Sequence, residues 1–233
     1  MKYTRWLILA ALAALSVALA PPAAAGRAQT SCHGIIADMT IVGDVVVPER
    51  VYCELDNVTV LGHLRVAERS TAALYDSRLA GGIAGVRFEA VLLQNSSAGG
   101  DLQLTGGVTA WIEGATVAGD VRLVDNLDTR LNGARLERSL TVLRSRSQVQ
   151  FCGVSVGGDA RFAGNEGWVT IGGDSATCAA NQVGGTLRVQ RNLQETTVAN
   201  NTVGGDLICA ANAPAPLVFG NQVRGATRGQ CVR

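Results

Sequence analysis

The chain is dominated by a repeat of 19 to 20 residues. The phrase "VGGDL" at 203–207 recurs in related forms, such as "VAGDV" at 117–121 and "VGGTL" at 183–187. With the glycine before the aspartate taken as the anchor, the repeat falls at ten positions: Gly43, Gly62, Gly81, Gly100, Gly119, Arg138, Gly158, Gly185, Gly205 and Gly225. All steps between anchors are 19 or 20 residues except one of 27. Such a period is typical of a solenoid in which each repeat forms one coil.

Three columns of this repeat are almost wholly apolar, and they lie seven residues before, two before and two after the anchor. The first column reads Ile36, Leu55, Leu74, Leu93, Ile112, Leu131, Phe151, Cys178, Val198 and Val218. Between the columns the residues alternate, as in "LRV" at 64–66, and a period of two indicates a strand with one buried face. The pattern therefore predicts an all-β fold, a single-stranded parallel β-helix of about ten coils. We expect a right-handed turn, because the inward columns are unevenly spaced and left-handed β-helices favour regular hexapeptide steps.

Turn residues occupy fixed places in each coil. We expect the anchor glycines to supply a positive φ at a corner, and the aspartates that follow them to hydrogen-bond their own turn. Asn181, Asn201 and Asn221 share one column, so their amides are expected to form a ladder. Aspartates on adjacent coils, such as Asp101 and Asp120, are also a candidate cation site, although the glycine-rich nonapeptide of calcium-binding β-rolls is absent.

Residues 1–25 have a basic tip, an apolar run and a small-residue end, which together predict a secretory signal peptide cleaved after Ala25. An uncleaved N-terminal anchor is the alternative. The expected domain, 26–233 with a lengthened coil near 164–180, has 18 arginines against 19 acidic residues, a net charge of −1. A near-neutral domain has no overall field to attract nucleic acid or a membrane surface. No other stretch is long and apolar enough to span a bilayer. We therefore expect an exported protein, in the periplasm, at the cell surface or outside the cell.

The six cysteines fit the repeat when they are paired in sequence order. Their spacings of 21, 26 and 22 residues correspond to neighbouring coils, so we expect three disulfides: Cys32–Cys53, Cys152–Cys178 and Cys209–Cys231. The outer two would staple the ends of the rod, and the middle one would tie down the lengthened coil. An alternative makes Cys32, His33, Cys53 and His63 a zinc site, but these cysteines lack the close spacing of zinc ligands.

The sequence contains no P-loop, no H-E-x-x-H and no G-x-S-x-G motif. We therefore predict no catalytic residues, cofactor or metal, and an enzyme is not the favoured interpretation. A possible basic strip lies at the outward position three after the anchor, and it consists of Arg65, Arg122, Arg161 and Arg188. This strip is either a site for sulfated or carboxylated glycans or a solvated strand face.

The most specific surface feature lies eight residues before the anchor. Leu92, Trp111 and Arg130 follow one another in this column and are expected to face outward, with Tyr75 and Glu113 close by. Trp111 could stack on a sugar ring or form a cation–π pair with Arg130. The Trp111 surface is therefore the candidate site for a cell-wall or extracellular polysaccharide.

Ice-binding β-helices need flat rows of threonine. The column three before the anchor contains threonines, but Arg78 and Arg135 interrupt it, so the sequence disfavours ice binding.

The segments "VTVLGHLRV" at 58–66 and "VGGTLRV" at 183–189 resemble a broad group of secreted bacterial proteins with degenerate V-x-G-[DN]-L repeats. That resemblance covers nearly all of the chain after residue 25, and it implies a right-handed β-helix without an assigned activity. The repeat is also similar to that of bactofilins, which are cytoskeletal β-helices that polymerise end to end. The predicted signal peptide and the cysteine pairs of this chain depart from the bactofilin pattern. Pectate-lyase-like enzymes share the fold class, but none of their catalytic positions has a match here.

Together these observations predict an exported, non-enzymatic β-solenoid that acts as a structural or surface-binding module. The alternative is a β-helix that binds polysaccharide or acts on it as a lyase or hydrolase. A third possibility is an end-to-end polymer, which the stapled ends disfavour.

Overall fold

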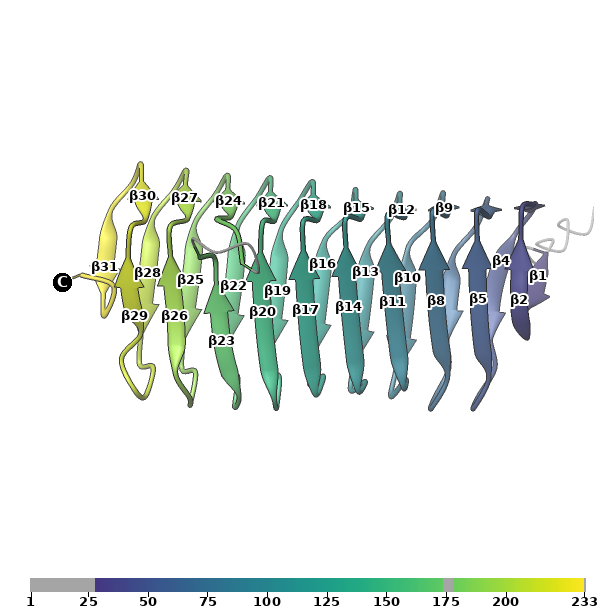
Figure 1. The fold of residues 1–233 in the computed structure, drawn as a ribbon, viewed down its shortest axis with the longest axis horizontal. Coiled ribbons are helices and arrows are strands. Elements are labelled where there is room, and N and C mark those ends of the chain that lie inside the picture. Colours follow the sequence, from purple (N-terminus) through teal and green to yellow (C-terminus); the bar gives the residue numbers. More distant parts are fainter. Residues whose placement is uncertain (1–27, 174–177, 233) are drawn as a thin grey trace, which may run out of the picture.

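The structure, a computed structural model, describes residues 28–173 and 178–232. This part of the chain is all-β and forms a rod of about ten coils with three parallel sheets along its length (Figure 1). In Figure 1 the chain runs up the near face, returns down the far face and advances from right to left, which is a right-handed turn. The predicted parallel β-helix is therefore confirmed.

Each coil contributes one strand to each sheet. Sheet B contains β2 Gly34–Ala37, β5 Tyr52–Asp56, β8 Thr71–Tyr75, β11 Ala90–Gln94, β14 Thr109–Glu113, β17 Asp128–Asn132, β20 Gln148–Cys152, β23 Trp168–Ile171, β26 Thr196–Ala199 and β29 Leu217–Phe219. Sheet C contains β3 Thr40–Ile41, β6 Thr59–Val60, β9 Arg78–Leu79, β12 Ser97–Ala98, β15 Thr116–Val117, β18 Arg135–Leu136, β21 Ser155–Val156, β24 Gln182–Val183, β27 Thr202–Val203 and β30 Gln222–Val223. Sheet A contains β1 Gln29–Ser31, β4 Asp44–Val47, β7 Leu64–Val66, β10 Ile83–Val86, β13 Leu102–Thr105, β16 Val121–Val124, β19 Leu140–Leu143, β22 Ala160–Ala163, β25 Leu187–Gln190, β28 Leu207–Ala210 and β31 Thr227–Gly229.

The core consists of the inward columns that the repeat predicts. Leu55, Leu74, Leu93 and Ile112 stack in register across sheet B, and each is at most 1% exposed. Burying an aliphatic side chain of this size contributes roughly 1.5–3 kcal/mol. Because every coil adds such residues, the stacked coils supply the core that a single coil lacks.

The predicted register is wrong at the lengthened coil. The structure pairs Phe151 with Ile171, and Ile171 with Val198, so Ile171 and not Cys178 occupies the inward column. The extra residues therefore follow β23 and lie between Ile171 and Gln182, where 174–177 fall outside the described residues. An insertion at a corner shifts the sequence count without changing the stacking of the strands.

The anchor glycines do not have the predicted backbone conformation. Among the anchor glycines only Gly43 has a positive φ, of 105°. A Cβ atom on Gly119 would instead lie 2.5 Å from the backbone nitrogen of Asp101, and one on Gly205 would lie 2.8 Å from the carbonyl carbon of Gly185. Glycine recurs at the anchor because successive coils approach too closely there for a side chain.

Positive φ values are found at two other corners. Between sheets B and C the left-handed residues include Asn57 and Asn95, with φ of 53° and 51°, and asparagine tolerates this region well. Between sheets A and B they include Arg144, with φ of 52°. The Arg144 guanidinium donates to both carboxylate oxygens of Asp125, at 2.6 and 2.7 Å. These hydrogen bonds hold the pKa of Asp125 below its ordinary value.

The aspartate column links neighbouring coils, which corrects the expectation that each aspartate bonds its own turn. Oδ1 of Asp101 accepts a hydrogen bond from the backbone N–H of Asp120 at 2.9 Å, and Asp120 accepts from Ser139 at 3.1 Å. His63 takes the same role, since its Nδ1 accepts from the Gly82 N–H at 3.0 Å. Each of these side chains therefore caps a backbone N–H one coil further along the rod.

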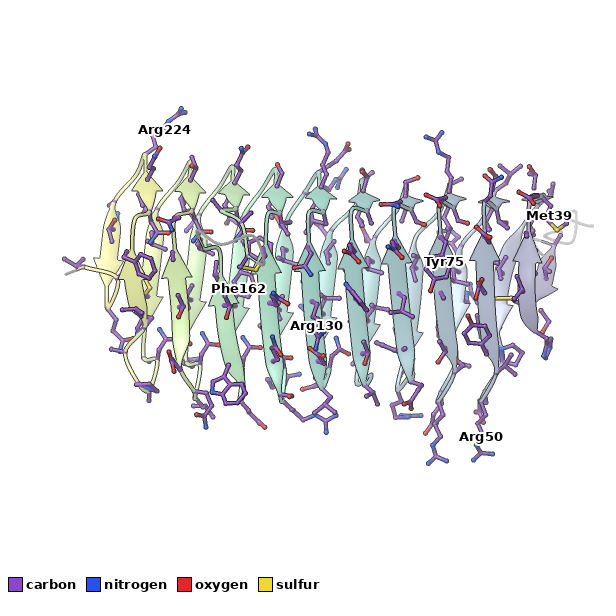
Figure 2. The ribbon with its side chains drawn as sticks, viewed as in Figure 1. Met39, Arg50, Tyr75, Arg130, Phe162 and Arg224 are labelled. Carbon is purple, nitrogen blue, oxygen red and sulfur yellow. A yellow bond between two sulfur atoms is a disulfide. The ribbon has the colours of Figure 1, made fainter. Side chains whose placement is uncertain are left out.

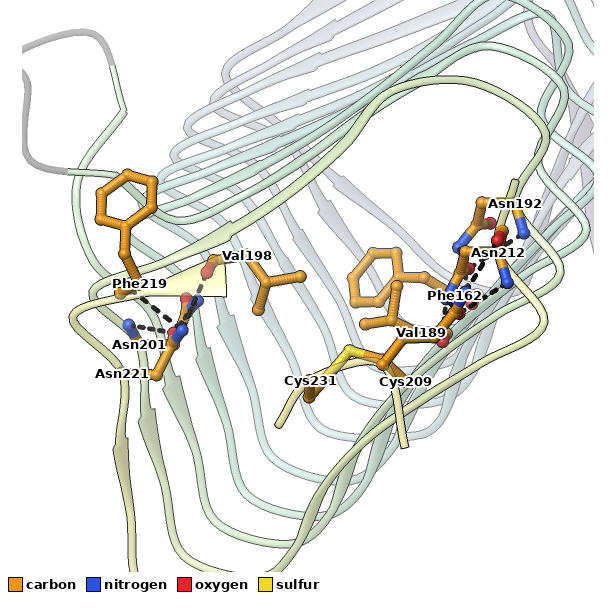
Figure 3. Close-up of a disulfide and its surroundings, with 11 residues drawn as sticks. Phe162, Val189, Asn192, Val198, Asn201, Cys209, Asn212, Phe219, Asn221 and Cys231 are labelled. Carbon is orange, nitrogen blue, oxygen red and sulfur yellow. Dashed lines mark hydrogen bonds between the residues drawn. A yellow bond between two sulfur atoms is a disulfide. The ribbon is translucent and has the colours of Figure 1, made fainter. Parts of the chain in front are cut away.

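The predicted asparagine ladder is present, and the structure adds a second one. Nδ2 of Asn181 donates to Oδ1 of Asn201 at 2.9 Å, and Asn201 donates to Asn221 in the same way. The second ladder lies between sheets A and B and consists of Asn165, Asn192, Asn212 and Gln230. Figure 3 shows Asn192 and Asn212 of this ladder. Because these ladder asparagines are buried or half-buried, their mutual hydrogen bonds offset the cost of removing the amides from water.

All three predicted disulfides are present. They join Cys32 to Cys53, Cys152 to Cys178 and Cys209 to Cys231. The first joins the first coils of the rod, and the last crosses the open C-terminal end (Figure 3). The zinc alternative is wrong, because Cys32 and Cys53 are bonded to each other and offer no thiolate to a metal.

Candidate functional site

The outer face of sheet B gathers the polar aromatic residues of the rod. Both tryptophans and both tyrosines of the described residues, Tyr52, Tyr75, Trp111 and Trp168, occupy outward positions of its strands. Trp168 is 62% exposed and Tyr52 is 47% exposed. The phenylalanines Phe88, Phe151 and Phe162 are buried in the core instead. The aromatic rings of the described residues are therefore divided between the core and the outer face of sheet B, where Phe219 is also half-buried.

The predicted cluster around Trp111 is largely assembled. Tyr75, Leu92, Trp111 and Glu113 line one hollow of ≈ 50 Å³, together with Leu93 and Gln94. This volume holds one or two water molecules and is too small for a sugar ring. A saccharide would have to lie across the hollow instead of entering it.

Arg130 is adjacent to Trp111 in the sheet but makes a different contact. The two residues are register partners on β17 and β14, and Arg130 lies on the near face in Figure 2. Its guanidinium forms an ion pair with Asp128 at 2.8 Å, and Arg130 does not line the hollow. The expected cation–π pair is absent from the described part of the chain.

Trp111 occupies an outward position, as expected, but its side chain is half-buried. Its Nε1 atom is buried and, like Oδ1 of the half-buried Asn132, lacks a hydrogen-bond partner in the structure. The ring itself lies among Leu92 and Tyr75 at the hollow. The hollow at Trp111 is therefore mainly apolar, with Gln94 and Glu113 as its polar members.

Tyr52 and Glu54 form a polar pair at one end of this face. The Tyr52 hydroxyl donates to Oε2 of Glu54, two residues along β5. This hydrogen bond, with smaller contributions from burial and from the Glu54 charge, raises the pKa of Tyr52 to about 12. The phenol is therefore held in its neutral, donating form.

The predicted basic strip lies on the outer face of sheet A, where anionic residues accompany it. Arg188 pairs with Asp159 at 3.1 Å, and Arg65 lies 3.9 Å from a carboxylate oxygen of Asp44. Arg122 and Arg161 share the same exposed face. Because the aspartate column lies beside the arginine column, the strip is a surface of mixed charge and not a purely cationic one.

Sequence reasoning missed Trp168 and the second asparagine ladder. Trp168 lies in the lengthened coil, where the count from the anchor fails, although its outward place follows once Val169 and Ile171 are recognised as inward. The ladder residues Asn165, Asn192 and Asn212 recur at coil spacing, so their common column was a detectable signal.

Together, the stacked coils and the aromatic outer sheet define the class of protein as a disulfide-stapled parallel β-solenoid. Comparison with protein-family models, curated proteins and solved structures gives no match for the chain. In residues 28–173 and 178–232, no helix of a length and apolarity suited to crossing a membrane is present. The same residues contain no cluster of three or more histidine, cysteine or acidic side chains suited to a metal ion.

Proposed function

We propose that this protein is an exported, non-enzymatic β-solenoid that binds an extended polysaccharide along the outer face of sheet B. The observation that carries the proposal is the placement of Tyr52, Tyr75, Trp111 and Trp168 on that one face. Tyrosine and tryptophan combine a flat apolar ring with a polar handle, which suits the apolar faces and hydroxyl edges of sugars. Neighbouring side chains such as Gln150 and Thr170 add hydrogen-bonding groups.

The placement of these rings favours a ligand that runs obliquely along the rod, because Tyr75, Trp111 and Trp168 lie in three different columns of sheet B. Tyr75 and Trp111 are two coils apart, and Trp111 and Trp168 are three coils apart. With adjacent parallel strands about 4.8 Å apart, these axial separations are about 10 and about 14 Å. Each sugar of an extended β-linked glycan advances the chain by about one interstrand distance. One glycan chain would therefore meet an aromatic ring every two or three sugars.

Export is supported by the three disulfides, because such bonds persist in oxidising compartments. A binding role without catalysis is supported by the polar side chains of the repeat. Asp101, Asp120, His63 and the asparagine ladders are all engaged in hydrogen bonds between coils. Their geometry serves the stack of coils.

A head-to-tail fibre fits the strand count poorly. In the described chain sheet A has eleven strands, whereas sheets B and C have ten each. If copies stacked so that sheets B and C continued, β31 of one copy and β1 of the next would need the same place in sheet A. If sheet A continued instead, sheets B and C would each be left with a gap. This mismatch supports a single rod as the working unit.

The proposal is tested by co-sedimentation of the oxidised mature protein with insoluble cell-wall and plant polysaccharides. We expect retention by at least one polymer, weakened by Trp168→Ala and Trp111→Ala and abolished by the double variant. The matched control is Arg122→Ala, an exposed change on sheet A. Unchanged circular dichroism and melting temperature would show that each variant is folded.

Three results would overturn the proposal. Retention that survives the double tryptophan variant would place the binding surface elsewhere, and no retention by any polymer would leave a purely structural rod. Release of new reducing or unsaturated chain ends by the pure protein would instead support the polysaccharide-active alternative.

A further inference from the structure

A second surface feature lies on the outer face of sheet A, away from the aromatic residues. A trough of ≈ 650 Å³ extends over β1, β4, β7, β10 and β13. It exists because Gly82 and Ala84, which lie at its centre, carry no long side chain. Ala84 pairs in register with Arg65 on one side and Gln103 on the other. The small residues form the floor, and the longer polar side chains of the adjacent coils form the walls.

One polar side chain on each wall is held by a backbone hydrogen bond. The His63 ring is fixed by its Nδ1 contact with the Gly82 N–H at 3.0 Å. When this ring is neutral, its proton is therefore on Nε2, which remains available as a donor. The Asp101 carboxylate is fixed by the contact of Oδ1 with the Asp120 N–H at 2.9 Å, so Oδ2 remains available as an acceptor. Side chains that are already ordered lose less entropy when they bind a ligand.

The two walls offer complementary hydrogen-bonding groups. His63 and Arg65 present donors on one side, while Asp101 presents an acceptor and Gln103 presents both kinds of group on the other. Arg65 is well exposed and its contact with Asp44, at 3.9 Å, is long, so most of its five N–H groups remain available. A ligand in this trough would meet donors and acceptors on opposite sides.

The charge of the trough excludes strongly ionic ligands. Arg65 lies between Asp44 and Asp101, which belong to the coil before it and to the second coil after it. An anion would face both carboxylates, and a cation would face the guanidinium. A sugar hydroxyl is neutral, and it donates one hydrogen bond while accepting others. We propose that this trough is a binding site for a neutral saccharide, recognised through its hydroxyl groups by His63, Arg65, Asp101 and Gln103.

The size of the trough agrees with this ligand class. Its volume lies in the range of about 300–1,000 Å³ that small-molecule sites occupy, whereas the hollow at Trp111 holds ≈ 50 Å³. The trough shares no residue with the sheet B surface, so this inference does not depend on the function proposed above.

The test is calorimetric titration of the oxidised mature protein with three sets of soluble oligosaccharides: neutral, uronate-containing and amino-sugar-containing. The blocking variant is Ala84→Gln, which places a longer neutral side chain on the floor of the trough. Its matched control is Thr141→Gln, an outward position in the same column three coils further along. The titrations are made in the Trp111→Ala/Trp168→Ala background, so that the sheet B surface does not contribute to the binding.

We expect a neutral oligosaccharide to bind, with affinity reduced about tenfold or more by Ala84→Gln or Asp101→Asn and unchanged by Thr141→Gln. Preference for uronates or amino sugars would show that the ligand class is wrong. Binding that is insensitive to Ala84→Gln, or no binding of neutral sugars, would overturn the site itself.

A second readout uses the wild-type protein and so does not rely on a variant of the site. His33 and His63 are the only histidines in the chain, so the imidazole NMR signals are assigned by comparison with His33→Ala. Addition of the neutral oligosaccharide is expected to shift the His63 ring signals and leave those of His33 in place. If the His63 signals do not move at saturating sugar, the proposed site is wrong.

Discussion

The side chain of Asn181 donates a hydrogen bond through Nδ2 to Oδ1 of Asn201 at 2.9 Å, and both residues are almost completely buried. The backbone N–H of Asn181 points to the same oxygen, at 3.3 Å. Asn201 donates in turn to Asn221 and to the carbonyl oxygen of Ile171. One amide therefore links three successive coils at this corner.

Replacing Asn201 should weaken the rod strongly. Asn201→Leu would leave the Asn181 N–H and amide without an acceptor, and each buried unsatisfied group costs about 1–3 kcal/mol. We expect a loss of about 2–4 kcal/mol in the free energy of unfolding, measured by guanidinium denaturation. The matched control is Asn221→Leu at the half-buried end of the ladder, where water can reach the freed groups. An equal loss in both variants would contradict this account.

Substitutions of two glycines should separate close approach from backbone conformation. Gly119→Ala places a Cβ 2.5 Å from the backbone nitrogen of Asp101, so we expect a loss of about 1–3 kcal/mol from overpacking. Gly133 has a φ of 59° and nothing closer than 4.0 Å to an added Cβ. Gly133→Asn should therefore cost less than about 1 kcal/mol, because asparagine tolerates this conformation. Thermal unfolding of the two variants would check the order, and a reversed order would refute the close-approach explanation.

The Cys209–Cys231 disulfide should protect the C-terminal coil. It closes a segment with a sequence separation of 22 residues, for which the loop-entropy model gives a stabilisation of about 3 kcal/mol. The double variant Cys209→Ser/Cys231→Ser is expected to lose hydrogen-exchange protection first in β29, β30 and β31. The corresponding change at Cys32 and Cys53 serves as the control, since it should expose the opposite end. Uniform loss of protection along the rod would show that the bond acts globally.

The Tyr52–Glu54 pair should be visible in an alkaline titration. Because its hydroxyl donates to Glu54, Tyr52 has its pKa raised from 10.0 to about 12. The folded state therefore binds this proton more tightly than the unfolded chain does. Any stability that the pair contributes is present below pH 10 and is lost as the pH rises through about 12. Ultraviolet difference spectroscopy should show the Tyr52 pKa moving down towards 10 in Glu54→Gln, with Tyr75→Phe used to remove the second tyrosine signal. An unchanged titration would mean that Glu54 is not the cause.

The repeat in the sequence determined the coil, the inward columns and the disulfide pairing. This was possible because a residue and its counterpart 19 or 20 positions later lie one above the other in adjacent coils. Leu74 and Leu93 meet across sheet B for this reason, and so do the coils joined by Cys32 and Cys53. A local apolar period and a constant step were enough to place the core.

The tertiary structure alone decided the contacts between neighbouring coils. Oδ1 of Asp101 caps the following coil and not its own turn, and Gly119 is required by the proximity of Asp101 and not by its φ. The insertion after Ile171 displaced the count that would have placed Trp168 on sheet B. The trough over Gly82 and Ala84 depends on the size of side chains in the two flanking coils. Periodicity specifies which residues share a column, whereas the axial distance between coils and the direction of each side chain determine what those residues contact.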